Sequence, residues 1–205
     1  MVNDYLRKKY LQALDGAEFD PDAVTEELSA IIRCYTEHHR HYHNLDHLMR
    51  LLSLCDELEI KDPRIILAVF YHDTIYHPGS SKNEEESAAL ASESLSRLGV
   101  DLSRVDRVCE MILATADHLK PTDDPLTQLF LDLDMSILGS TREEFKAYVE
   151  GVRKEHHKFT EVLFKNNRSK FLKKILAAES IFHTDLFREK YEDSARANIK
   201  WELGK

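Results

Sequence analysis

Hydrophobic residues recur three or four positions apart along almost the whole chain, which is the spacing of one helix face. In the stretch "RIILAVFY", residues 64–71, they stand on every side, so we expect that helix to be buried in the middle of the fold. The same pattern predicts helices over residues 2–15, 22–37, 45–55, 64–71, 81–98, 103–116 and 141–152, and two or three further helices over 157–178 and 184–203.

Residues that favour helix ends stand close to several of these boundaries. Asn44 has a side chain suited to an N-cap, and Gly16 and Gly99 are suited to ending helices. A Ser or Thr followed three positions later by an acid predicts a capping box, in which each side chain binds the other residue's main chain. This spacing occurs at Ser81–Glu84, Ser103–Asp106 and Thr141–Glu144.

The stretch "LFLDLDMSIL" departs from helical spacing. Its apolar and polar residues alternate, which is the pattern of a strand. A lone strand among helices would leave its main-chain groups without partners, so we predict a buried helix. Side chains two positions apart on a helix point in directions about 200° apart, so Asp132 and Asp134 should not both face one ligand.

The composition agrees with an all-α protein, because the chain has only 6 Gly and 5 Pro among 205 residues. A hydrophobic fraction of 42% is enough for one full core, and the length favours a single domain spanning residues 1–205 over the alternative of two small domains. Three cysteines without a CxxC pair indicate thiols in a reducing compartment. Because the sequence has no membrane-length apolar run and no apolar leader, we expect a cytoplasmic protein without a membrane span.

Acidic residues outnumber basic ones, and the net charge is -9 with histidine neutral. Non-specific binding to nucleic acid requires a basic field, so the sequence predicts no nucleic-acid partner. A small anionic ligand in a locally positive pocket remains compatible with this charge. The sequence does not reveal an oligomeric state.

Ionisable residues occur in three apolar surroundings, where burial is costly unless they have partners. They are His43 and His47 at the leucine-rich helix, the dipeptide His72–Asp73 after the most apolar helix, and the aspartates Asp132 and Asp134. Two imidazoles and two carboxylates around a divalent cation would remove this cost, and both groups are common metal ligands. The other histidines of "HHRHYHNLDH", at positions 38, 39 and 41, are more typical of a solvated surface.

The order His, His-Asp, Asp across several helices resembles the HD superfamily of metal-dependent phosphohydrolases, whose fold is an all-α helical bundle. Two strings, "YHNLDH" (42–47) and "HDTIYHPGSSKNEEESAALA" (72–91), are similar to motifs of cyclic-nucleotide phosphodiesterases. The second string has one extra residue between His-Asp and His-Pro-Gly, and the chain is much shorter than those catalytic domains. Over residues 28–203, the sequence looks closer to a small bacterial-type family of predicted metal-dependent HD phosphohydrolases.

The resemblance implies four ligands of a divalent cation (Mn, Zn, Ni, Fe or Mg): His47, His72, Asp73 and Asp134. Asp134 matches the last aspartate of the family better than Asp132 does, although the sequence leaves the choice open. His43 matches the acid that protonates the leaving oxygen. Asp73 would accept a proton or bridge a second ion.

Other residues of the same motifs are candidates for a second metal or a phosphate contact: His77, His118, Asn83 and Lys82. His118 follows a predicted helix and could equally cap its C-terminal end. Glu84 falls in the "NE" string that the resemblance makes catalytic, and its capping-box partnership with Ser81 is an equal alternative. Arg40 and Arg196 could contact phosphate, although surface salt bridges are the more common role of such residues.

These assignments predict an enzyme, namely a metal-dependent phosphohydrolase that uses metal-activated water. Its substrate would be a phosphomonoester or phosphodiester of a small metabolite or nucleotide. Two alternatives share the fold: a non-catalytic HD module that binds a nucleotide for regulation, and an HD-type di-iron oxygenase with additional histidine ligands. A structural or interaction protein with a histidine-rich surface is the third alternative.

Overall fold

The computed structural model describes residues 2–204, which form ten α-helices and two short 3-10 helices and contain no strand. The all-α prediction is therefore confirmed. The chain divides into two compact units, Met1–Ala116 and Asp117–Lys205. The single-domain organisation stays a prediction.

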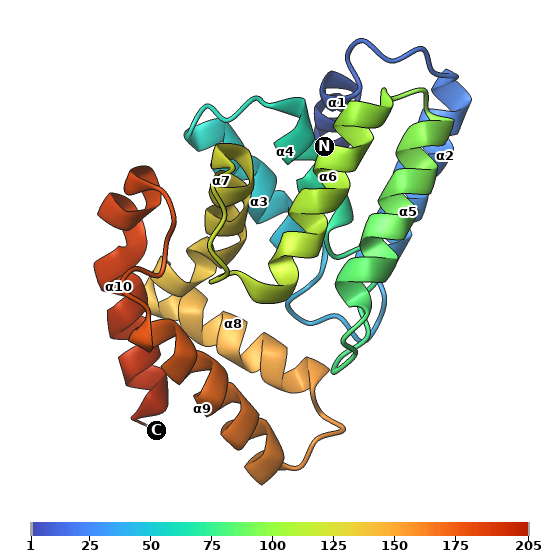
Figure 1. Ribbon diagram of the computed structural model, residues 1–205. Coiled ribbons are helices and arrows are strands. Elements are labelled where there is room, and N and C mark those ends of the chain that lie inside the picture. Colours follow the sequence, from blue (N-terminus) through green and yellow to red (C-terminus); the bar gives the residue numbers. More distant parts are fainter. Residues whose placement is uncertain (1, 205) are drawn as a thin grey trace. The chain divides into compact units, whose positions relative to one another are not determined.

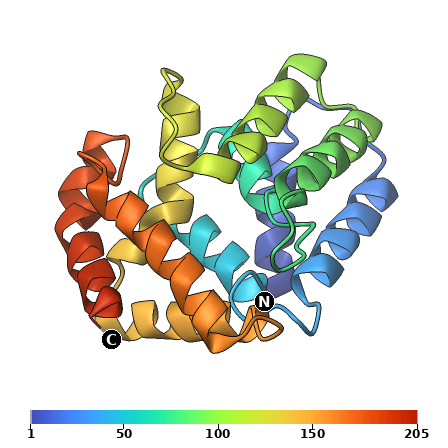
Figure 2. The same ribbon diagram turned by 60° about the horizontal axis from the view of Figure 1, so that its bottom comes forward.

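The first unit is built around a buried central helix. It contains α1 (Val2–Ala13), α2 (Pro21–Tyr35), α3 (Leu45–Glu57), α4 (Pro63–Tyr71), α5 (Asn83–Arg97) and α6 (Leu102–Ala114). Helix α4 contacts α1, α3, α5 and α6 (Figure 1). Its residues from Ile65 to Tyr71 are all buried, as the apolar sequence predicts. Helices α5 and α6, coloured green, lie side by side in Figures 1 and 2.

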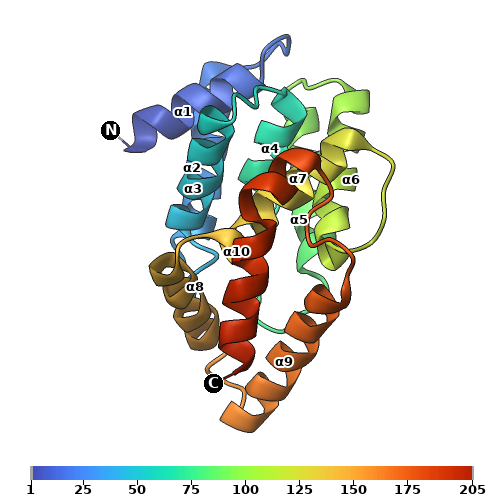
Figure 3. The same ribbon diagram turned by 90° about the vertical axis from the view of Figure 1, so that its left-hand side faces the viewer.

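The second unit contains α7 (Pro125–Met135), α8 (Arg142–Glu155), α9 (Glu161–Ala177) and α10 (Asp185–Leu203). The short helix η1 (Thr115–Asp117) follows α6, and η2 (Ser136–Gly139) follows α7. Helix α10 packs against η2 and α9 (Figure 3). Gly139 permits the close approach of α10, because a Cβ atom at this position would lie 2.6 Å from Cβ of Tyr191.

The alternating stretch of residues 129–138 is helical and mostly buried, as predicted. It forms the second half of α7 and most of η2. A helix pairs these main-chain groups with one another, whereas a lone strand would leave them without partners.

Three helices begin at an Asp-Pro pair. Asp20, Asp62 and Asp124 are the N-caps of α2, α4 and α7, and the proline after each occupies the start of the helix. Each aspartate accepts a main-chain N–H of the first turn. The proline that follows it has no N–H group, so it leaves no donor without a partner at the first position of the helix. The recurring dipeptide is a signal for helix starts that the hydrophobic pattern does not contain.

Two predicted helix starts are confirmed. The side chain of Asn44 accepts the main-chain N–H groups of Asp46 and His47 at the start of α3. Thr141 and Glu144 form the capping box that opens α8. Each cap satisfies N–H groups that the first helical turn leaves without partners.

Two other helix starts differ from the prediction. Helix α5 begins at Asn83, so Ser81 lies before the N-cap and its predicted capping box with Glu84 is wrong. Helix α6 begins one residue earlier than expected, because the carboxylate of Asp101 accepts the N–H of Arg104. Aspartate is as good an N-cap as serine. The sequence therefore does not show whether Asp101 or Ser103 caps α6.

Candidate metal centre

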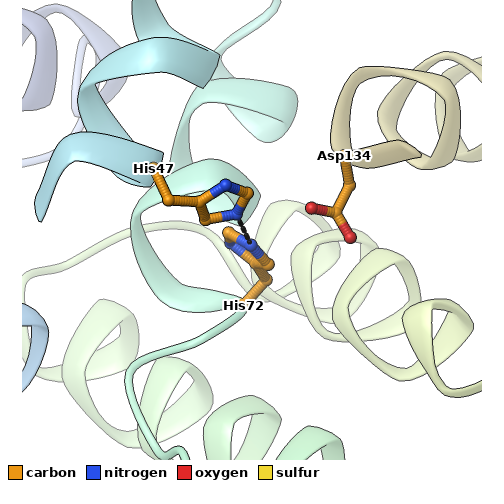
Figure 4. Close-up of side chains that lie close together, drawn as sticks. All are labelled: His47, His72 and Asp134. Carbon is orange, nitrogen blue, oxygen red and sulfur yellow. Dashed lines mark hydrogen bonds between the residues drawn. The ribbon is translucent and has the colours of Figure 1, made fainter. Parts of the chain in front are cut away.

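Two buried histidines of the first unit face each other through their Nε2 atoms. His47 lies in the first turn of α3, where Asn44 accepts its main-chain N–H, and His72 is the C-cap of α4. The two Nε2 atoms are 3.1 Å apart, as the dashed line in Figure 4 shows. The side chains are 1% and 2% exposed, so bulk water does not separate them.

The main chain of α4 determines which nitrogen of His72 carries hydrogen. Its Nδ1 atom lies 3.1 Å from the carbonyl oxygen of Val69, which can only accept a hydrogen bond. Nδ1 therefore donates, and in the neutral ring Nε2 presents a lone pair toward His47. Metal-binding histidines are commonly oriented by such a contact to a carbonyl group.

Asp73 adds a carboxylate to the two imidazoles. Its Oδ2 atom lies 3.1 Å from Nε2 of His72 and 3.6 Å from Nε2 of His47. Burial acts to raise the pKa of Asp73, but the nearby His72, His43 and His47 outweigh it and leave the pKa below its ordinary value. The carboxylate is therefore ionised at neutral pH.

The spacing of these three atoms fits a divalent cation. Nitrogen and oxygen ligands bind zinc at about 2.1 Å, so neighbouring ligand atoms are about 3.0 Å apart in octahedral geometry and about 3.4 Å apart in tetrahedral geometry. The measured separations are 3.1, 3.1 and 3.6 Å. Imidazole with carboxylate is a donor set that several divalent ions accept. The His/Asp cluster could therefore bind a metal ion.

Asp134 lies on α7 and is partly buried. Its Oδ2 atom is 2.7 Å from Nε2 of His118. Figure 4 draws Asp134 of the second unit together with His47 and His72 of the first. The ligand types do not determine the identity of an ion bound by His47, His72 and Asp73.

Asp132 points away from Asp134 and holds the start of α10. Its two oxygens accept the main-chain N–H groups of His183 and Thr184 at 2.7 and 2.8 Å, and the Thr184 hydroxyl group at 2.6 Å. Burial raises the pKa of Asp132, and these hydrogen bonds offset part of the shift. The acceptor positions of Asp132 are thus used within the second unit, which favours Asp134 as the ligand.

His118 follows η1 and is partly buried. Its imidazole contacts Asp134, and its carbonyl oxygen accepts a hydrogen bond from Nε2 of His183 at 2.7 Å. Helix α6 ends earlier, at Ala114. The side chain therefore serves the carboxylate, and the alternative of a cap for α6 is not the arrangement observed.

His43 lies between aromatic rings next to the histidine pair. Its ring stacks on Tyr76 with centroids 4.2 Å apart, and it meets Tyr42 edge to face at 4.8 Å. The centroid of His47 is 6.0 Å away. The ring of His43 is partly buried and held beside the cluster.

The "HPGSSKNE" segment is arranged around one buried amide. Asn83 is 9% exposed, accepts the main-chain N–H of His77 and donates to the carbonyl oxygen of His77. Asn83 therefore shapes the loop rather than facing a ligand. His77 and Lys82 are exposed, and Glu84 lies partly buried in the first turn of α5.

Both arginines that the sequence suggests for phosphate or surface pairing are instead used within the fold. Arg196 is partly buried, binds Glu192, and donates to the carbonyl oxygens of residues 176, 178 and 179. Arg40 is buried and binds Glu37 and three carbonyl groups. Their sequence positions carry no signal for this, because most of the carbonyl partners come from distant segments.

The remaining histidines of the opening cluster behave mostly as predicted. His38 and His41 are exposed. His39 is partly buried, and its Nε2 atom lies 2.9 Å from the carbonyl oxygen of Tyr76. His39 therefore supports the loop that carries Tyr76, which the expectation of a fully solvated side chain did not include.

No protein-family model, curated protein or solved structure matches this chain. Within residues 2–204, every helix is too short or too polar to cross a membrane.

Proposed function

We propose that the protein is a metal-dependent phosphohydrolase that acts on a phosphomonoester or phosphodiester of a small metabolite or nucleotide. The observation that supports this most directly is the cluster of His47, His72 and Asp73, whose ligand atoms are 3.1 to 3.6 Å apart. The resemblance of the motifs around these residues to the HD superfamily supplies the reaction class.

Asp134 is the fourth ligand in this proposal. Its carboxylate is oriented by His118, and its neighbour Asp132 is occupied at the start of α10. A ligand set of two imidazoles and two carboxylates leaves positions for water and for a phosphoryl oxygen. A divalent cation bound there would activate water near neutral pH and neutralise charge on the phosphoryl oxygens.

Two side chains of the first unit move protons in this scheme. The Asp73 carboxylate, ionised at neutral pH, accepts the proton that the attacking water loses. His43, when protonated, donates a proton to the departing oxygen, and its stacking on Tyr76 limits the rotation of the ring. The products are an alcohol and either phosphate or a phosphomonoester.

The full-length chain tests this proposal in two measurements. Metal content is determined after purification without chelators and after reloading with Mn²⁺, Ni²⁺ or Zn²⁺, and turnover is measured on a panel of nucleotides, cyclic nucleotides and sugar phosphates. We expect about one or two bound ions per chain and turnover of at least one phosphate ester that a chelator abolishes. A chain that binds no divalent ion at any position would refute the proposal.

One contact favours a second candidate, an HD-type di-iron oxygenase. His118 places an additional imidazole 2.7 Å from Asp134, and extra histidines are what such a centre requires. Iron retained through purification, together with oxygen uptake and no phosphate release, would support this candidate. Tight nucleotide binding without turnover would instead support a regulatory module.

A further inference from the structure

Arg40 carries a charge in the interior of the first unit. Its side chain is 0% exposed, and the guanidinium group makes four hydrogen bonds. Nε donates to the Glu37 carboxylate at 2.9 Å, and the two terminal nitrogens donate to main-chain carbonyl oxygens. A buried cation is costly unless its donors are satisfied, so this position requires a specific set of partners.

The carbonyl partners belong to two segments that are distant in sequence. Nη1 donates to the carbonyl oxygen of His43 at 3.1 Å and to that of Asp73 at 2.5 Å. Nη2 donates to the carbonyl oxygen of Thr74 at 2.9 Å. One planar group therefore joins the loop that carries the candidate acid to the segment that carries the candidate ligand.

Two aromatic rings lie close to the guanidinium group. Its Cζ atom lies 5.4 Å from the ring centroid of Tyr35 and 5.5 Å from that of Tyr76. These are cation–π distances. The same two tyrosines contact the two segments, because Tyr76 stacks on the His43 ring and the Tyr35 hydroxyl group accepts the Asp73 N–H at 3.4 Å.

We propose that Arg40 is a positioning residue that fixes the acid His43 and the metal ligand Asp73 relative to each other. The roles named for those two residues rest on the proposed phosphohydrolase function. The geometry of Arg40 itself does not depend on it. Lysine cannot replace arginine here, since an ammonium group has no planar fork that reaches several carbonyl oxygens at once.

The test compares Arg40→Lys, in the loop after α2, with Arg33→Lys, an exposed arginine on α2, in the full-length chain. The first readout is the dissociation constant for Mn²⁺, measured by electron paramagnetic resonance. Loss of a group that orients a ligand raises such constants about 10- to 100-fold, and we expect this for Arg40→Lys but not for the control. A lowered melting temperature with an unchanged dissociation constant would show a merely structural role and overturn the proposal.

The second readout is amide hydrogen exchange, which needs no metal. We expect residues 41–47 and 72–76 to exchange faster together in Arg40→Lys, while both are unchanged in Arg33→Lys. If only one segment or neither responds, Arg40 does not couple them and the proposal fails. If the wild-type chain binds no Mn²⁺, the proposed function fails, and joint loss of protection still supports the positioning role of Arg40.

Discussion

Asp134 and His118 are joined through Oδ2 and Nε2 at 2.7 Å, and this contact is the end of a longer chain of hydrogen bonds. The carbonyl oxygen of His118 accepts from the ring of His183, and the main-chain N–H of His183 donates to Asp132. The two aspartates of α7 are thus connected through His118 and His183, which lie in two different loops of the second unit. Because Asp132 and Asp134 have different partners, we expect substitution of Asp132 to change stability and substitution of Asp134 to change metal binding.

Asp132→Asn should lower the stability of the protein without preventing metal binding. The amide keeps one acceptor oxygen, so at least one of the N–H groups of His183 and Thr184 loses its carboxylate partner. We expect a cost of about 1–3 kcal/mol in urea unfolding. The exposed residue Asp123 provides the control, because Asp123→Asn should change stability by less than about 0.5 kcal/mol.

Asp134→Asn should show the opposite result. We expect Mn²⁺ affinity to fall at least about tenfold, while urea unfolding changes less than it does in Asp132→Asn. If Asp132→Asn were the variant that lost the metal, the assignment of the ligand on α7 would be reversed.

Asp73→Asn should abolish most metal binding. An amide oxygen is a weaker ligand than a carboxylate, and the substitution removes the negative charge that faces His47 and His72. We expect the bound Mn²⁺ per chain to drop by at least about tenfold. The matched control is Asp46→Asn on the exposed face of α3, for which the metal content should be unchanged.

His43→Ala should lower turnover while leaving the metal bound. Loss of a general acid typically reduces the rate about 10²- to 10⁴-fold, and Mn²⁺ affinity should stay near the wild-type value. The measurement is kcat on whichever phosphate ester the substrate panel identifies. Undiminished kcat would rule out the acid role of His43, and lost Mn²⁺ would indicate that His43 is itself a ligand.

Asp62→Asn should make stability less dependent on acid pH. A side-chain hydrogen bond from Arg64 lowers the pKa of Asp62 below its ordinary value of 3.8, so the ionised group stabilises the folded state. That contribution is present above pH 3.8 and is lost as the pH falls through the lower pKa of the folded state.

Asparagine keeps the N-cap of α4 and removes the charge. We expect a cost of up to about 1 kcal/mol in urea unfolding near neutral pH, which shrinks as the pH falls below 3.8 and through the lower pKa of the folded state. Asp62→Ala loses the cap as well, so its cost should persist at low pH. A deficit of Asp62→Asn that grows as the pH falls would contradict this account.

The sequence predicts the helices of this protein well because burial imposes a visible period on it. The run from Ile65 to Tyr71 is apolar on every side and is the buried helix of the first unit. The alternating stretch around Asp132 and Asp134 is a more difficult case. A lone strand there would lack partners, and the helix predicted for that reason is the one observed. Helix starts are less predictable where two residues compete for the same role, as Asp101 and neighbouring Ser103 do.

The candidate site is predicted by the chemistry of residues that do not belong in apolar surroundings. The pairing of His47 with His72 and Asp73 follows that logic. The buried role of Arg40 could not be predicted, because main-chain carbonyl oxygens are present at every residue and leave no mark in the sequence. His118 could be taken for a helix cap because the carboxylate that its ring contacts, that of Asp134, stands 16 positions away in the sequence.

The close spacing of Asp132 and Asp134 ties the evolution of two properties together. A single inserted or deleted residue between them would turn one carboxylate by about 100° around α7. A variant in which this helix is rotated would lose the hydrogen bonds of Asp132 and fold poorly, whether or not Asp134 still faced the candidate site. The hydrogen bonds that Asp132 needs for stability therefore also preserve the orientation of Asp134 on α7.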